Sequence, residues 1–131
     1  MPFRFEWRDE TQRAITYIAE GDWNWRDYHH AARASAFTLM SAEHPVDSVI
    51  DLRGSTRIAL PAGAGAHLRS FGRVTQARLT GRAAVIGSPD VDAEGLRDGV
   101  LQTADGFVKF VDSETELAAL LTEWADNPPA R

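Results

Sequence analysis

The residues of this chain that are best suited to catalysis lie near its centre. A histidine that acts as a general base needs an orienting carboxylate and a nucleophile. Asp51 and Ser55 precede His67 by a short interval, so the three would serve a hydrolase if the fold brought them together. A serine, a histidine and an aspartate occur in almost any chain of this length. We therefore predict no catalytic residue and keep a hydrolase using His67 as the weakest hypothesis.

Anion recognition is the second chemistry that the sequence offers. Residues 52–89 carry six arginines and no acidic residue, although the whole chain has a net charge of −5. Arginine makes bidentate contacts with carboxylates and phosphates. Two interpretations are open: the arginines pair with the acidic C-terminal third inside the fold, or they form an exposed face that binds an anion or a partner. On the second interpretation the candidate site consists of Arg57, Pro61, Ala62, Gly63, Gly65, Arg69 and Arg73.

The segment Gly63-Ala64-Gly65 is expected at the start of a helix, with Arg69 and Arg73 on one solvent-facing side of that helix. Free N–H groups at a helix start can hold an anion. Alternatively, small residues there allow the helix to pack close to a sheet. No Lys-Ser or Lys-Thr pair follows, so the segment is not a P-loop.

The chain offers weak signals for metals and for an interface. His29 and His30 are adjacent, and neighbouring helical residues project about 100° apart, so we predict a solvent-facing pair and no metal or other cofactor. Trp23 and Trp25 flank an expected helix start, and an i, i+2 pair on a helix cannot both face one core. One of them is therefore a candidate interface aromatic, unless both are partly buried in a loop.

Composition limits the class of protein. Of the 131 residues, 44% are hydrophobic and 25% charged, as in ordinary globular domains. The absence of cysteine excludes disulfides, a thiol nucleophile and thiolate metal sites. The acidic balance argues against nucleic acid as a partner. No apolar run approaches the roughly 18 residues of a membrane span, and the charged N-terminal segment lacks a signal-peptide core, so we expect no membrane insertion and a cytoplasmic location.

Hydrophobic periodicity predicts an α/β domain that must position these residues. Strands are expected over residues 3–8, 14–19, 46–52, 83–87 and 107–111, and helices over 24–42, 62–79, 89–103 and 113–126. The order is ββαβαβαβα, with a mixed sheet of about five strands. Its opening hairpin is antiparallel, its later strands are mainly parallel, and helices pack on it. Residues 1–126 form a single domain, and residues 127–131 form a frayed tail.

Three short stretches carry a family resemblance. Residues 51–58 (DLRGSTRI) are similar to D-L-S-G-V-x-x-I, the third strand and exit loop of the STAS domain, the fold of the anti-sigma-factor antagonists. Residues 60–68 (LPAGAGAHL) follow that family's D-S-S-G-L-G-x-L-L, and residues 108–117 resemble its closing strand and helix start. Pro61 and Ala62 occupy the places of the two serines, one of them the phosphorylated one, so the chain looks closer to the SpoIIAA-like relatives that lack this serine.

The resemblance implies a non-enzymatic, bacterial type of protein-interaction module in signalling, without the serine phosphoswitch. Its partner would be another protein or a second copy of the chain, and we expect a homodimer. The alternative is a carrier or sensor of a small apolar or anionic ligand, lipid-like or nucleotide-like, with the expected helix containing Gly95 and Gly99 as a lid.

Overall fold

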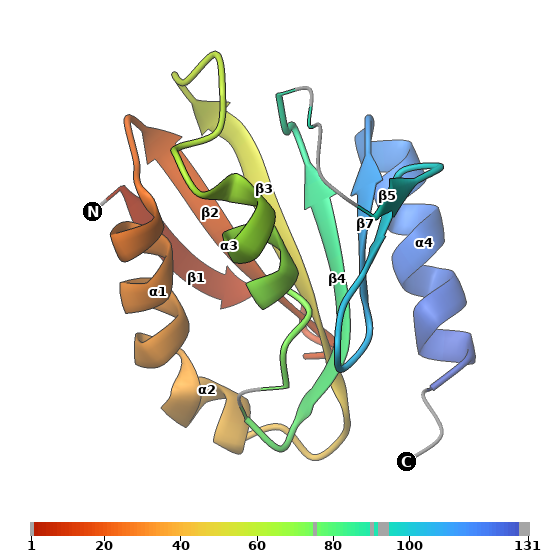
Figure 1. Ribbon diagram of the computed structural model, residues 1–131. Helices are drawn as coiled ribbons and strands as arrows, with labels where there is room; N and C mark the ends of the chain where they lie inside the picture. The colour runs from red at the N-terminus through yellow and green to blue at the C-terminus, as the bar shows by residue number, and fades with distance from the viewer. Residues whose placement is uncertain (1, 75, 90, 92–94, 129–131) are drawn as a thin grey trace.

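Alternating side chains build the sheet, beginning with the first strand. In β1 (Phe3–Trp7), Phe3, Phe5 and Trp7 face the core while Arg4 and Glu6 face outward. The structure is a computed structural model that describes residues 2–74, 76–89, 91 and 95–128. Within these residues one seven-stranded sheet runs in the order β1-β2-β3-β4-β7-β6-β5 (Figure 1). The other strands are β2 (Ala14–Gly21), β3 (Val46–Ser55), β4 (Leu79–Ile86), β5 (Leu96–Arg97), β6 (Val100–Gln102) and β7 (Phe107–Val111).

The pairing directions confirm a mixed sheet in a single α/β domain. β1 and β2 form the predicted antiparallel hairpin, and β2, β3, β4 and β7 are parallel to one another. β5 and β6 add an antiparallel pair at the far edge. The carboxyl ends of the four parallel strands therefore meet at one edge of the sheet.

Local hydrogen bonds start the two longest helices where the sequence predicts them. At α1 (Trp25–Ala34), the Asn24 side chain accepts from the Asp27 N–H at 3.0 Å, and the Asp27 carboxylate accepts from the Asn24 N–H at 2.9 Å. At α4 (Glu114–Asp126), the Ser113 hydroxyl accepts from the Glu116 N–H at 3.1 Å. Such caps satisfy N–H groups that have no partner within the helix.

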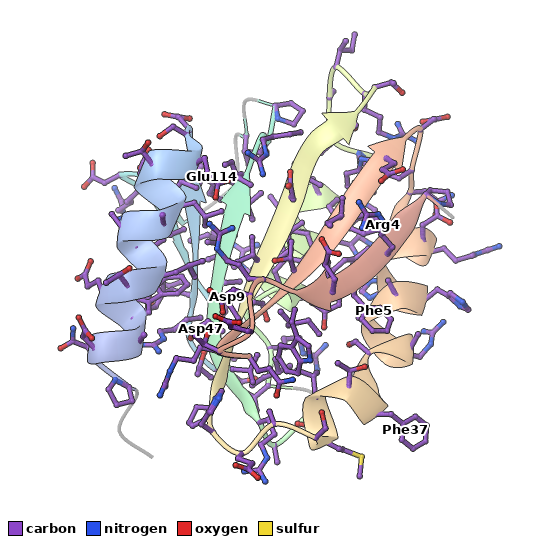
Figure 2. All side chains as sticks on the ribbon, turned by 180° about the vertical axis from the view of Figure 1, so that it is seen from behind. Arg4, Phe5, Asp9, Phe37, Asp47 and Glu114 are labelled. Carbon is purple, nitrogen blue, oxygen red and sulfur yellow. The ribbon has the colours of Figure 1, made fainter. Side chains whose placement is uncertain are left out.

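The helices divide between the two faces of the sheet. α1, α2 (Ala36–Met40) and α3 (Ala64–Ser70) cover one face, where the larger core includes Ile50, Leu68 and Val85 (Figure 1). α4 covers part of the other face, packing Leu117 and Trp124 on the second core. β1 and β2 lie outside the cover of α4 on this second face, where Arg4 pairs with Glu20 at 3.0 Å (Figure 2).

The helix predicted over residues 89–103 is wrong. Residues 96–97 and 100–102 are strands joined by a two-residue turn at Asp98 and Gly99, whose φ angles are 53° and 74°. Asp-Gly is a favoured sequence for a turn in which both residues have positive φ. Residues 90 and 92–94 of the expected helix lie outside the described residues. The helix proposed as a lid is therefore not present at Gly95 to Gln102. The observed element order is ββααβαββββα.

The helix predicted over residues 62–79 ends much earlier, at Ser70. Two backbone N–H groups after α3 donate to side chains instead of to helix carbonyls. The Asp105 carboxylate accepts from the Val74 N–H at 2.9 Å, and the Gln76 side chain accepts from the Arg78 N–H at 2.6 Å. The first predicted helix is likewise divided at Ser35, a buried residue whose hydroxyl bonds the Ala32 carbonyl. Both differences arise from side-chain hydrogen bonds that compete with helix continuation.

Among the helices of the described residues, none combines the length and the apolar character needed to cross a membrane. Of the expected tail, residues 129–131 lie outside the described part of the chain.

Candidate functional site

The loop between β3 and α3, residues 56–63, projects from the edge where the parallel strands end (Figure 1). Its first half is tied to the segment after β2. Arg57 forms an ion pair with Asp22 at 3.1 Å and donates to the Trp23 carbonyl. The Ser55 hydroxyl accepts from the Trp23 indole N–H at 2.9 Å and from the Arg57 N–H at 3.1 Å. These contacts hold the base of the loop in one position.

Trp25 fixes the second half of the same loop. Its indole N–H donates to the Pro61 and Ala62 carbonyls, at 3.2 and 3.0 Å. Its ring stacks on His67, with the ring centroids 4.8 Å apart and the planes 13° from parallel. Loop 56–63 is thus anchored at both ends by side chains from the segment that begins α1.

The expectation that Trp23 or Trp25 is an exposed interface aromatic is wrong. They are 1% and 6% exposed, and their rings meet edge to face at 5.0 Å. Trp23 precedes the cap residue Asn24, so it does not follow the helical geometry on which the i, i+2 argument relied. Each indole N–H has an acceptor, as buried tryptophans usually require.

Between its two anchors, loop 56–63 exposes an apolar tip. Ile58 is 98% exposed, and Ala59 and Ala62 beside it are exposed as well. Sequence analysis missed Ile58. Its signal was a β-branched apolar residue inside a segment with no strand or helix pattern, where polar residues are usual.

The predicted arginine cluster around the start of α3 does not form as expected. Arg57 is turned toward Asp22, and Arg69 donates back to the Gly65 carbonyl of its own helix at 3.0 Å. Arg73 lies three residues beyond the end of α3, so the expected i, i+4 pair with Arg69 is absent. Gly63 caps α3 with a φ of 84°, and a Cβ there would approach the His67 ring to 3.3 Å. This glycine is explained by backbone conformation and close packing.

Within the described residues, three arginines of segment 52–89 form ion pairs with aspartates of the N-terminal half. Arg57 pairs with Asp22, Arg82 with Asp47 at 2.9 Å, and Arg53 with Asp51 at 2.8 Å. Three of the six arginines thus pair with acids of the N-terminal half. From the acidic C-terminal third, the described residues contribute only Glu114, whose carboxylate lies 3.1 Å from Arg53.

Asp51, Ser55 and His67 do not assemble into a catalytic set. Asp51 faces the α4 side of the sheet, where burial opposes ionisation but hydrogen bonds from Arg53 prevail and lower the pKa of its carboxyl. His67 lies on the opposite side with α3, and the Ser55 hydroxyl is engaged by Trp23. The hydrolase hypothesis therefore has no geometric support.

His67 instead contacts another histidine. The His29 Nε2 and His67 Nδ1 atoms are 3.0 Å apart, which brings α1 and α3 together. Burial, then the charges of His67 and Arg33, lower the pKa of His29. Of the predicted solvent-facing pair, His30 is exposed, whereas His29 is half-buried and contacts His67. Nothing local in the sequence signals a contact between residues 38 positions apart.

No three histidine, cysteine, aspartate or glutamate side chains in the described residues cluster as a metal site would require. In comparisons with known proteins, no family model, curated protein or solved structure matches this chain.

Proposed function

We propose that this chain is a non-enzymatic, STAS-like interaction module of bacterial type that binds another protein through loop 56–63. It acts without the serine phosphoswitch of the anti-sigma-factor antagonists. The sequence support is the resemblance of residues 51–58, 60–68 and 108–117, with Pro61 and Ala62 in the places of the serines.

One observation carries this proposal: an isoleucine that is 98% exposed at the tip of a loop whose two ends are anchored. Exposing an isoleucine is unfavourable by roughly 1.5–3 kcal/mol relative to burying it. A partner that covers Ile58 recovers this free energy, and the fixed loop has little conformational freedom to lose on binding. Arg57, paired with Asp22, holds the base of the loop below the tip.

Site-specific photo-crosslinking in cells of the natural host tests the proposal. A photoreactive amino acid at position 58 is expected to capture one defined protein, and the same amino acid at the exposed Glu123 of α4 is the control. The contact should be lost when Arg57→Ala loosens the loop's base. Equal capture from positions 58 and 123, or capture from neither, would exclude loop 56–63 as the contact.

A further inference from the structure

A cavity of about 330 Å³ lies on the face of the sheet that carries α1 and α3. Its walls come from α1 and α2 on one side and from the end of α3 with Phe71, Arg73, Gln76 and Leu79 on the other. It is a separate feature from loop 56–63, which contributes none of its lining residues. Its volume falls at the lower end of the range of small-molecule sites.

The floor of the cavity contains a polar group with no partner. Ser48 of β3 interrupts a buried apolar row formed by Val46, Ile50 and Leu52. The residue is 7% exposed, and its hydroxyl, which opens into the cavity and is not itself sealed in the core, makes no hydrogen bond with any described residue. A hydroxyl without a partner inside the protein bonds either water or a bound molecule. Ser48 therefore offers a hydrogen-bonding group to a molecule in the cavity, at a position where the rest of the row is apolar.

A second hydroxyl in the lining shares this property. Tyr28 of α1 is buried, and its hydroxyl also lacks a hydrogen-bond partner among the described residues. Burial raises the pKa of Tyr28 far above its ordinary value, so the hydroxyl stays protonated and can donate. Its ring meets Phe71 edge to face at 4.7 Å, so the inner wall is aromatic as well as polar.

The rim of the cavity is cationic. Arg33 and Arg73 are exposed, and neither forms an ion pair with a described residue. Among the described residues no carboxylate lines this cavity, although the chain as a whole is acidic. In contrast, the cavity between α4 and the β1–β2 hairpin mixes arginines with Asp9, Asp47 and Asp126.

We propose that the cavity binds a small aromatic carboxylate that carries a hydroxyl group at the far end of its ring. The carboxylate pairs with Arg33 and Arg73 at the rim, where paired guanidinium groups suit it. The ring packs against Phe71, and its hydroxyl reaches Ser48 and Tyr28 on the inner wall. This arrangement gives every polar group named here a partner and leaves the apolar lining in contact with the ring.

The probe for this site is 3-(4-hydroxyphenyl)propanoate, compared by isothermal titration calorimetry with its amide and with 3-phenylpropanoate. We expect saturable one-to-one binding of the hydroxylated acid. The amide should bind about tenfold more weakly because it lacks the charge. Arg33→Gln with Arg73→Gln should cause a similar loss, and Arg78→Gln, an exposed arginine outside the lining, should cause none.

Ser48→Ala tests the inner wall separately. It should remove the preference of the wild-type chain for the hydroxylated acid over 3-phenylpropanoate, a preference expected to be about threefold or more. Ala32→Phe, which fills the cavity from α1, should abolish binding of both acids, with circular dichroism confirming the fold. Absence of saturable binding to the wild type, equal affinity for acid and amide, or a preference that survives Ser48→Ala would overturn the proposal. None of these results depends on a protein partner, so they are independent of the function proposed for loop 56–63.

Discussion

Arg82 and Asp47 form the most buried ion pair among the described residues, with side chains 12% and 6% exposed. Arg82 also donates to the Trp124 and Asn127 carbonyls at the end of α4, and its guanidinium lies 5.4 Å from the Trp124 ring centroid. Cations at a helix C-terminus interact favourably with its unpaired carbonyls. This one side chain therefore joins β4, β3 and α4.

Arg82→Met should lower the free energy of unfolding by about 3 kcal/mol, because it leaves the buried Asp47 carboxylate without its counterion. Urea denaturation measures the change, with Arg78→Met at an exposed arginine as the control. Asp47→Asn added to Arg82→Met should recover part of the loss. A double variant as unstable as the sum of the single changes would show that the two residues are not coupled.

His29 should make stability depend on pH near neutrality. Its pKa in the folded protein lies below the ordinary value of 6.5, mainly through burial and then through His67 and Arg33. Below pH 6.5 the unfolded chain therefore binds more protons at this position, so its contribution to stability is present above pH 6.5 and lost on acidification. His29→Gln should reduce the fall in unfolding free energy between pH 7.5 and 5.5.

His30→Gln, one residue away and exposed, is the control for this experiment. Asp51 and Glu114, whose pKa values are lowered, titrate below the chosen interval and do not contribute to it. The same fall in stability for His29→Gln and wild type would argue against the contact between His29 and His67.

At the scale of elements, one glycine in each of two segments, 89–103 and 62–79, has a different backbone conformation. In the first segment the predicted helix is absent, and in the second it ends early. Gly99 occupies the β5–β6 turn with a φ of 74°, whereas Gly65 lies inside α3, where a Cβ meets only the end of Arg69 at 3.8 Å. Alanine is strained in the first position and favoured in the second.

Gly99→Ala should therefore lower the free energy of unfolding by about 1 kcal/mol or more, and Gly65→Ala should raise it by about 0.5–1 kcal/mol. Thermal or urea denaturation of the two variants measures the pair of opposite effects. Stabilisation by Gly99→Ala would mean that the residue is not in the left-handed turn and that the β5–β6 hairpin is wrong.

At the scale of the whole molecule, self-association remains a prediction. Trp23 and Trp25 are buried and therefore do not supply the exposed aromatic side chain expected at the dimer interface. The exposed large apolar side chains in the described residues are Phe37, Met40 and Ile58. Phe37 and Met40 lie three residues apart on α2, and Figure 2 shows Phe37 pointing away from the molecule. They form an apolar surface that a second copy can cover.

We expect a homodimer in sedimentation velocity at high micromolar concentration, and Phe37→Ser with Met40→Ser should shift it to a monomer. Ile58→Ser is the comparison, since it alters a different exposed surface. A wild-type monomer under these conditions, or a dimer unaffected by the α2 substitutions, would contradict this assignment.

The sequence by itself determined those features that depend on neighbouring residues. Alternation specifies strands such as Phe3–Trp7 because successive side chains point to opposite faces of the sheet. Asn24 and Ser113 specify helix starts because each bonds an N–H three residues away. The turn at Asp98-Gly99 also depends only on neighbouring residues, so the dipeptide alone could have predicted it.

Only the tertiary structure decided the candidate sites, because their contacts join residues far apart in the chain. His29 meets His67 across 38 positions, and Trp25 reaches the Ala62 carbonyl across 37. In the sequence, Ser48 is only one polar residue in a strand. It becomes part of a cavity because α1 packs opposite Phe71, Gln76 and Leu79. Such contacts depend on how the elements pack in three dimensions, which periodicity within a single segment does not encode.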